Sequence, residues 1–527
     1  MQLIKINADK VQIRSDSFLK GIALNDVILV SDSEKGVQLV CTVESVIRNE
    51  DTEQFDYEGN LIEQAPSGTI ECAIIGSIVK GKFVKCVDHY PTTNVSIEKI
   101  SDGKFYDILK SDRHDLLPIG KYSNYGNIAY ISGNKFFQRH SAILGNTGSG
   151  KSVTVASLLE KLSGLNNANI VVFDIHGEYK NLSYAESIKI GNPGLPFPIW
   201  MLPFKDFYSG MLKMKEESAI TQIAALRSAF YEARRSDVSE NIPIAYSLEN
   251  VLRILDFKNG EEIETGEYFK TGDKAGLAKT VKGELFGKLF SVINLIEDKL
   301  ADKRYKFMTD YKEQNYLFEF LEKVFDNSEK KVKVIDFSDI PHDVMPSIIA
   351  AVTKLIYDVQ LKQKNTDVLP LQIICDEAHV YMPNDSVLGA SQRRLLEVFE
   401  TIAKEGRKFG ISLMIVSQRP SDINRTIIAQ CANYVVLKIS NEIDKQYIKS
   451  ILPDGSKGAI NEINLFSPGD CLIIGDSSSI VFKIKIDLPS ELPKSSTIDT
   501  FDVWNSKCNY NSKKFIYEIT KEDNLNG

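Results

Sequence analysis

The feature that most constrains this 527-residue chain is the segment Gly145–Ser152, which reads GNTGSGKS. It has the spacing of a phosphate loop, with glycines at its first and sixth positions followed by lysine and serine. Glycine lets backbone N–H groups converge on anionic oxygens, and the helix that follows points its positive end at them. We therefore expect Lys151 to reach the β- and γ-phosphates of a nucleoside triphosphate and Ser152 to ligate Mg²⁺.

The residues around the loop favour a strand on one side and a helix on the other. Ala142–Leu144 reads as a short buried strand, and apolar residues from Val155 to Leu162 recur with helical spacing before Gly164 ends the pattern. The predicted ligands are ATP and Mg²⁺. The predicted nucleotide-binding residues are Gly145, Asn146, Thr147, Gly148, Ser149, Gly150, Lys151, Ser152 and Val153.

Bulk composition limits the classes of protein to consider. The net charge of −8 argues against a simple DNA-coating protein, so any DNA contact must be local, as in a pore lining. Seven cysteines without C-x-x-C spacing argue against a disulfide framework and a structural zinc site. No apolar run is long enough to span a bilayer and the polar start lacks a signal-peptide core. We expect a cytoplasmic protein without membrane contact.

Short apolar runs divide the chain. Residues 1–105 hold β-rich runs at 27–30, 39–43 and 70–75 separated by turn residues, which predicts a small N-terminal β-barrel. Residues 106–203 and 331–490 carry apolar runs separated by helical segments, which predicts an α/β core with a parallel sheet covered on both faces. Residues 204–330 read as long polar helices, a helical insertion, and 491–527 form a C-terminal tail. The predicted core strands are 170–173, 332–335, 371–375, 412–416 and 434–437.

An apolar run that ends in two carboxylates is the second catalytic signal. Leu371–Cys375 is followed by Asp376 and Glu377. Beside a phosphate loop, Asp376 is expected to hold the magnesium shell and Glu377 to polarise the attacking water. The alternative is a strand followed by an acidic helix N-cap.

Three further polar residues are candidates for catalysis. Gln418 follows the run 412–416, where its amide can sense the γ-phosphate or orient water; the alternative is a cap on the turn before Pro420. Arg407 is a candidate finger that reaches a neighbouring subunit's nucleotide, and Arg139 is a second. Either arginine could instead complement a helix dipole. Asp174 and His176 fit a metal site poorly because a second histidine is missing, so Asp174 reads better as a polar group near the nucleotide or as a loop organiser.

Several blocks together resemble the HerA branch of the HerA–FtsK ATPases. They are Arg139–Gly145, Asp174–Tyr179 (DIHGEY), Asp376–His379 (DEAH), Gly406–Gly410 (GRKFG) and Gln418–Asp422 (QRPSD). The resemblance covers about residues 115–490, and the β-rich start is similar to that family's N-terminal barrel. It implies a RecA-like P-loop NTPase core and a homo-hexameric ring that uses ATP to move double-stranded DNA. The resemblance also implies that Arg407 is the arginine that acts on the neighbouring subunit's nucleotide. It implies that Gln418 is the sensor and that Arg139 is an arginine near the subunit boundary.

The same resemblance implies partners. Family members work with a NurA-like nuclease or with anti-phage defence effectors such as sirtuin-like proteins. The sequence thus predicts an ATP hydrolase acting as a DNA translocase or helicase. Two alternatives remain open. The first is a ring-shaped platform that assembles and activates an effector, with DNA movement secondary. The second is a polypeptide-moving relative of the secretion ATPases, which the absence of an apolar span disfavours.

Overall fold

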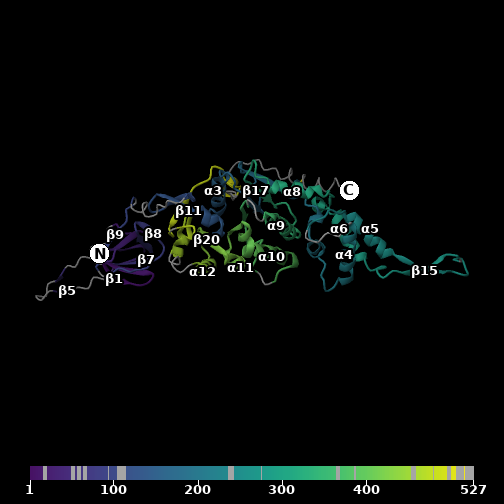
Figure 1. The fold of residues 1–527 in the computed structure, drawn as a ribbon, viewed down its shortest axis with the longest axis horizontal. Coiled ribbons are helices and arrows are strands. Elements are labelled where there is room, and N and C mark those ends of the chain that lie inside the picture. The colour runs from purple at the N-terminus through teal and green to yellow at the C-terminus, as the bar shows by residue number, and fades with distance from the viewer. Residues whose placement is uncertain are drawn as a thin grey trace.

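The fold was determined as a computed structural model. It describes residues 1–15, 21–48, 54–55, 61–62, 68–92, 94–101, 103, 114–234, 242–274, 276–363, 368–384, 387–452, 459–478, 480–494, 500–505 and 516. The molecule is elongated, with a β-rich end that carries the N-terminus, a central α/β body, and a helical end from which a thin β-hairpin projects (Figure 1).

The N-terminal end is an antiparallel sheet with the order β1-β2-β7-β4-β3-β9, and β8 pairs with β7. Its strands are β1 (Gln2–Ile6), β2 (Lys10–Ser15), β3 (Val27–Asp32), β4 (Val37–Arg48), β7 (Gly68–Val79), β8 (Lys82–Val84) and β9 (Ser96–Lys99). The three predicted β-rich runs lie in β3, β4 and β7. In this order β1 and β9 end the path, so closure into a barrel stays a prediction. A separate two-stranded ribbon joins β5 (Gln54–Phe55) to β6 (Leu61–Ile62).

The central body contains an eleven-stranded sheet with the order β11-β10-β22-β21-β20-β12-β19-β18-β13-β17-β14. Its strands are β10 (Leu116–Tyr122), β11 (Ile128–Ser132), β12 (His140–Leu144), β13 (Ile170–Asp174), β14 (Ala185–Lys189), β17 (Val332–Asp336), β18 (Leu371–Cys375), β19 (Ile411–Ser417), β20 (Cys431–Val436), β21 (Asp470–Gly475) and β22 (Lys483–Ile486). Every predicted core strand is present.

The five predicted core strands pair in parallel, as expected, but the sheet also has an antiparallel part that was not predicted from the sequence. The seven strands from β20 to β14 are parallel to their neighbours, but β21, β22, β10 and β11 add an antiparallel extension beside β20. Short connections explain the difference, because β10–β11 and β21–β22 are hairpins, and a hairpin can only join antiparallel strands.

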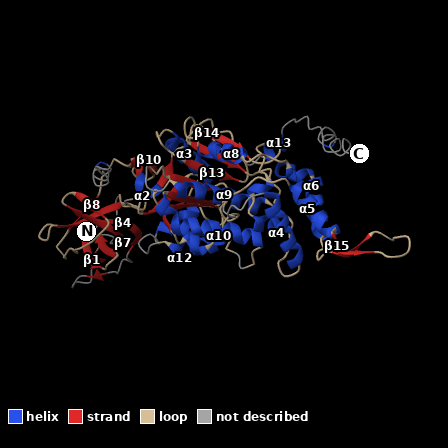
Figure 2. Ribbon diagram, turned by 45° about the vertical axis from the view of Figure 1, so that its right-hand side comes forward, coloured by secondary structure: helices blue, strands red, loops and turns tan. Residues whose placement is uncertain are grey.

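Helices cover both faces of the sheet (Figure 2). On one face Ile143, together with residues of the neighbouring strands that point the same way, packs against α3 (Lys151–Ser163). On the other face Ala142 and Leu144 pack against α9 (Met345–Lys362) and α10 (Ala390–Glu405). Alternate residues of one strand therefore enter opposite cores, as expected for a strand buried on both faces. Shorter core elements are α2 (Gly133–Phe137), η4 (Gly406–Phe409), η5 (Pro420–Asp422), α11 (Arg425–Ile428), α12 (Glu442–Ile451) and η7 (Ala459–Leu465).

The chain leaves the sheet after β14 and returns at β17, the strand beside it. Between them lie η1 (Ile199–Met201), η2 (Asp206–Met211), α4 (Ile220–Arg234), α5 (Leu248–Gly260), α6 (Phe290–Ala301), η3 (Lys303–Tyr305), α7 (Lys306–Thr309) and α8 (Asn315–Phe325). The segment is not wholly helical, because β15 (Glu262–Tyr268) and β16 (Ala278–Lys282) form the projecting hairpin. That this segment is an insertion into the core stays a prediction.

The domain limits proposed from the sequence are not tested by these contacts. The boundary at 105/106 lies outside the described residues, and of the tail only 491–494, α13 (Thr500–Asn505) and 516 are described. Among the described residues, no helix combines the length and the apolar character that crossing a membrane requires.

Candidate active site

The segment Gly145–Ser152 joins the end of β12 to the start of α3, as a phosphate loop requires. Gly148 and Gly150 have φ angles of 73° and 98°, a region that favours glycine. A Cβ on Gly145 would lie 2.6 Å from Ser149 Oγ, and one on Gly150 would lie 2.9 Å from the Gly469 nitrogen. The backbone of the loop therefore has no room for side chains at Gly145 and Gly150, and Lys151, Ser152 and Val153 begin the helix.

Two later segments hold the loop in place. The Asn146 N–H donates to the Lys438 carbonyl at 2.9 Å, and the Gly469 N–H donates to the Ser149 carbonyl at 2.9 Å. Gly469 lies in the turn that begins β21, and Lys438 follows β20. Sequence reasoning missed both, and the only local signal was the Pro468-Gly469 turn pair.

Lys151 is buried beside a group of carboxylates. Its side chain donates to the Asn146 carbonyl at 3.0 Å, within the loop itself. Burial lowers the pKa of Lys151, while Glu377, Asp376 and Glu178 act in the opposite direction. Lys151 thus lies near Asp376, the predicted magnesium ligand, and Glu377, the predicted catalytic carboxylate.

Strand order explains how Gln418 comes between the loop and Glu377. Strand β19 lies between β12, which leads into the loop, and β18, which leads into Asp376. The Thr147 hydroxyl donates to Gln418 Oε1, and Gln418 Nε2 donates to Glu377 Oε1 at 2.9 Å. The amide of Gln418 therefore connects the loop to the acid, rather than capping the turn before Pro420.

Glu377 has a strained backbone. Its φ is 50°, which is uncommon for a residue other than glycine and clusters at functional sites. The Ala378 N–H, donating to the Val416 carbonyl at 2.8 Å, holds the next residue against β19. Turns follow Asp376, and the next long helix, α10, starts at Ala390, so the pair caps no helix. Nothing in the sequence signalled the left-handed conformation.

Three carboxylates, those of Glu178, Asp376 and Glu377, lie near the single ammonium of Lys151. Burial, reinforced by Glu178 and Glu377, raises the pKa of Asp376 to about 7. One carboxylate oxygen of Glu178 and one of Glu377 are buried without a hydrogen-bond partner. The described residues hold no group of three or more His, Cys, Asp or Glu arranged to ligate a metal. The carboxylates near Lys151 nevertheless fit Mg²⁺, because Mg²⁺ binds through only one or two carboxylates, together with phosphate oxygens and water.

The loop after β13 completes this side of the site. The Asp174 carboxylate accepts from the backbone N–H groups of His176, Gly177 and Tyr179 at 3.1, 2.7 and 2.9 Å, so it organises the loop. That loop brings Glu178 and the buried Tyr179 against Ser152. Neither was predicted as a site residue, although both belong to the DIHGEY block.

The two predicted arginines lie at the other edge of the sheet. Arg139 precedes the first residue of β12 and forms an exposed ion pair with Asp476 at 2.8 Å. Arg407 lies in η4, just before β19, and its exposed side chain has no hydrogen bond or ion pair among the described residues. Strand β12 is five residues long, about 16 Å, so neither arginine lies beside its own phosphate loop. Arg407 also follows the C-terminus of α10, so a dipole role stays open.

Comparison with known proteins identifies relatives of this chain. The family model described as "Helicase HerA, central domain" matches residues 117–356. The chain is 31% identical over 366 residues to the DNA double-strand break repair helicase HerA of Saccharolobus solfataricus, covering 67% of this chain and 65% of that protein. It is 31% identical over 363 residues to the protein of the same description from Sulfurisphaera tokodaii, covering 66% and 65%. The matched region therefore spans 65% of the length of these relatives.

Among solved structures, VirB4 of Thermoanaerobacter pseudethanolicus aligns with a TM-score of 0.49 and 15% identity, covering 72% of this chain and 98% of that one. The family model spans the phosphate loop and β17, and the relatives match two-thirds of the chain. With the loop, the Asp376-Glu377 pair and Gln418 assembled at one edge of an α/β sheet, the chain belongs to the HerA-like ATPases.

Proposed function

We propose that this protein hydrolyses ATP with Mg²⁺ to move double-stranded DNA, as a translocase or helicase. The names of the curated relatives, DNA double-strand break repair helicases, support the DNA substrate. The observation that carries the proposal is the contact series Thr147–Gln418–Glu377, which links the phosphate loop to the predicted general base. Such a link suits an enzyme that couples hydrolysis to the state of the γ-phosphate.

Each residue then has a distinct role. Bound Mg²⁺·ATP supplies the phosphoanhydride bond that is hydrolysed. Lys151 and the loop amides neutralise phosphate oxygens, Ser152 and Asp376 hold the metal, and Glu377 accepts the proton of the attacking water. Gln418 orients Glu377 through its 2.9 Å hydrogen bond, so a change at the loop end of the amide alters the position of the base.

The location of the arginines supports a ring. Because Arg407 lies at the sheet edge opposite its own loop, it can serve a nucleotide only across a subunit boundary. We propose a homo-hexamer in which Arg407 acts on the neighbour's ATP and Arg139 lies at the same boundary. The net charge of −8 favours local DNA contact inside such a ring.

We further propose that the β-rich N-terminal sheet is a small barrel and that the 204–330 segment is an insertion, both added to a RecA-like core. A NurA-like nuclease or an anti-phage defence effector such as a sirtuin-like protein is the proposed partner, on the family resemblance. A cytoplasmic location suits a DNA substrate.

The test is ATP hydrolysis measured with and without duplex DNA, together with the mass of the particle in solution. We expect a hexamer whose turnover rises with DNA. Equal turnover with and without DNA would count against a DNA motor. If Glu377→Ala assembles and supports a co-purified effector as well as wild type does, the protein is an assembly platform instead.

A further inference from the structure

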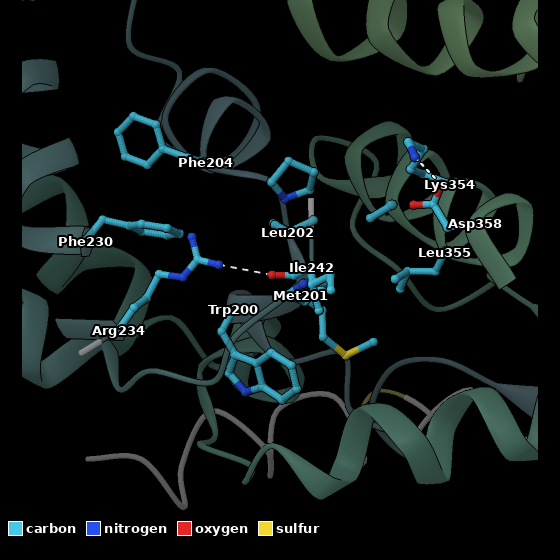
Figure 3. Close-up of a pocket in the computed structure, with 13 residues that line it drawn as sticks. Trp200, Met201, Leu202, Phe204, Phe230, Arg234, Ile242, Lys354, Leu355 and Asp358 are labelled. Carbon is cyan, nitrogen blue, oxygen red and sulfur yellow. Dashed lines mark hydrogen bonds and ion pairs between the residues drawn. The ribbon is translucent and has the colours of Figure 1, made fainter. Parts of the chain in front are cut away.

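A pocket away from the nucleotide site lies where the helical segment meets the core. Its walls come from η1 and the residues after it, from the C-terminal end of α4, and from α9 (Figure 3). It encloses about 60 Å³, room for a few water molecules or one small organic acid. None of the residues proposed to bind nucleotide lines it.

The charged group in this pocket without an ion pair to a described carboxylate is Arg234, at the end of α4. The side chain is buried, with only 9% of the residue exposed. Its Nη2 donates to the Ile242 carbonyl at 3.1 Å, and the guanidinium lies 5.1 Å from the centre of the Phe230 ring. Its Nε is buried and has no hydrogen-bond partner among the described residues. Figure 3 shows the guanidinium directed into the pocket between Phe230 and Ile242.

No described carboxylate neutralises this charge. Asp358 lines the pocket, but it is paired with Lys354, its neighbour one turn earlier on α9. The hydroxyl of Tyr246 lies near Arg234 and is itself buried without a partner. Burial lowers the pKa of Arg234. An unpaired buried cation is costly, so the pocket is better suited to an anion than to water alone.

The shape of the site selects the kind of anion. A guanidinium presents its N–H donors in a planar fork that matches the two oxygens of a carboxylate. Apart from the Lys354–Asp358 pair the remaining walls are apolar, with Trp200, Leu202 and Leu355 facing the pocket. A dianionic phosphate would lose more hydration there than a carboxylate on an apolar stem.

We propose that this pocket binds a small monocarboxylic acid, with Arg234 holding the carboxylate and Trp200, Phe230 and Leu355 enclosing its apolar part. The ligand would contact α4 and α9 at once. It would thereby hold the 204–330 segment, which contains α4, against α9, the helix that covers one face of the sheet. This assignment is independent of the ATPase proposal, because it involves none of its residues.

The two tryptophans of the chain make a direct test possible. Trp200 lines the pocket, and the other, Trp504, is exposed, so Trp504→Phe leaves Trp200 as the only reporter. We expect butyrate to change the Trp200 emission saturably. Butyramide, the uncharged analogue, and inorganic phosphate should not. Absence of a butyrate response, or an equal response to butyramide, would overturn the proposal.

Variants identify the group that binds. Arg234→Gln should weaken butyrate binding by about tenfold or more, because a charge-assisted hydrogen bond is lost. Arg234→Lys keeps the charge but not the fork and should also bind more weakly, which covers the case in which Arg234→Gln fails to fold. Arg253→Gln, at an exposed position of α5 outside the pocket lining, is the control and should bind as wild type does. Unchanged affinity in both folded Arg234 variants would refute the site.

Discussion

His140 gives a stability prediction that can be worked from the structure. It is the first residue of β12, and only 1% of it is exposed. The Leu413 N–H donates to its Nδ1 at 2.9 Å, so the proton of the neutral ring lies on Nε2, which donates to the Ala403 carbonyl at 3.0 Å. Burial lowers the pKa of His140 to about 4, and Arg407 acts in the same direction. The folded protein therefore holds this ring neutral.

The sign of the pH effect follows from that lowered pKa. An unfolded histidine titrates near 6.5, so the unfolded chain takes up a proton before the folded one does, and stability is lost as pH falls from 6.5 towards 4. With pKa values of about 6.5 and 4, the loss between pH 7 and pH 5 is about 2 kcal/mol. His140→Asn keeps an acceptor for the Leu413 N–H but does not titrate. Its unfolding free energy should fall by about 2 kcal/mol less than that of wild type over this range.

The assay is urea unfolding at pH 7 and pH 5, followed by a probe of the core. Burial raises the pKa of Asp206 to about 6, which acts oppositely with pH, but Asp206 is present in both proteins and its effect cancels in the comparison. His176→Asn, at an exposed position, is the control and should keep the wild-type pH dependence. If His140→Asn loses as much stability as wild type between the two pH values, the neutral buried ring is the wrong assignment.

Three further predictions concern the nucleotide site. Lys151→Ala should weaken ATP binding, whereas Glu377→Ala should keep binding and lower turnover by about 10²-fold or more, because only Glu377 acts mainly on the attacking water. Equilibrium binding and single-turnover assays separate the effect on binding from the effect on turnover. Equal loss of binding in the two variants would contradict the assignment. Arg407→Ala should abolish turnover, and mixing it with Glu377→Ala should restore part of it in shared rings; a mixing series without recovery would remove the trans role. Gly150→Ala should lower both stability and ATP affinity more than Gly148→Ala, because its Cβ would meet the Gly469 nitrogen at 2.9 Å whereas that of Gly148 meets nothing within 4 Å; comparable melting and binding in the two variants would refute this.

Much of the fold could be predicted from the sequence, because its signals are local. The phosphate loop, the strand before it and the helix after it are specified within about twenty residues, and continuous apolar runs marked the parallel strands. The antiparallel extension escaped because β21 is a continuous apolar run that carries no sign of its direction. The β15–β16 hairpin escaped because its strands are almost wholly exposed.

The sequence by itself determined the local pieces of the predicted site: a glycine-rich loop, a lysine placed to meet phosphate, and a carboxylate pair at a strand end. Only the tertiary structure decided that β19 lies between β12 and β18, and thereby that Gln418 joins Thr147 to Glu377. It also decided that Arg407 lies at the far edge and that Arg234 is buried with no ion pair to a carboxylate in the described part of the chain. Strand order and burial depend on contacts between residues hundreds of positions apart, and no local pattern encodes them.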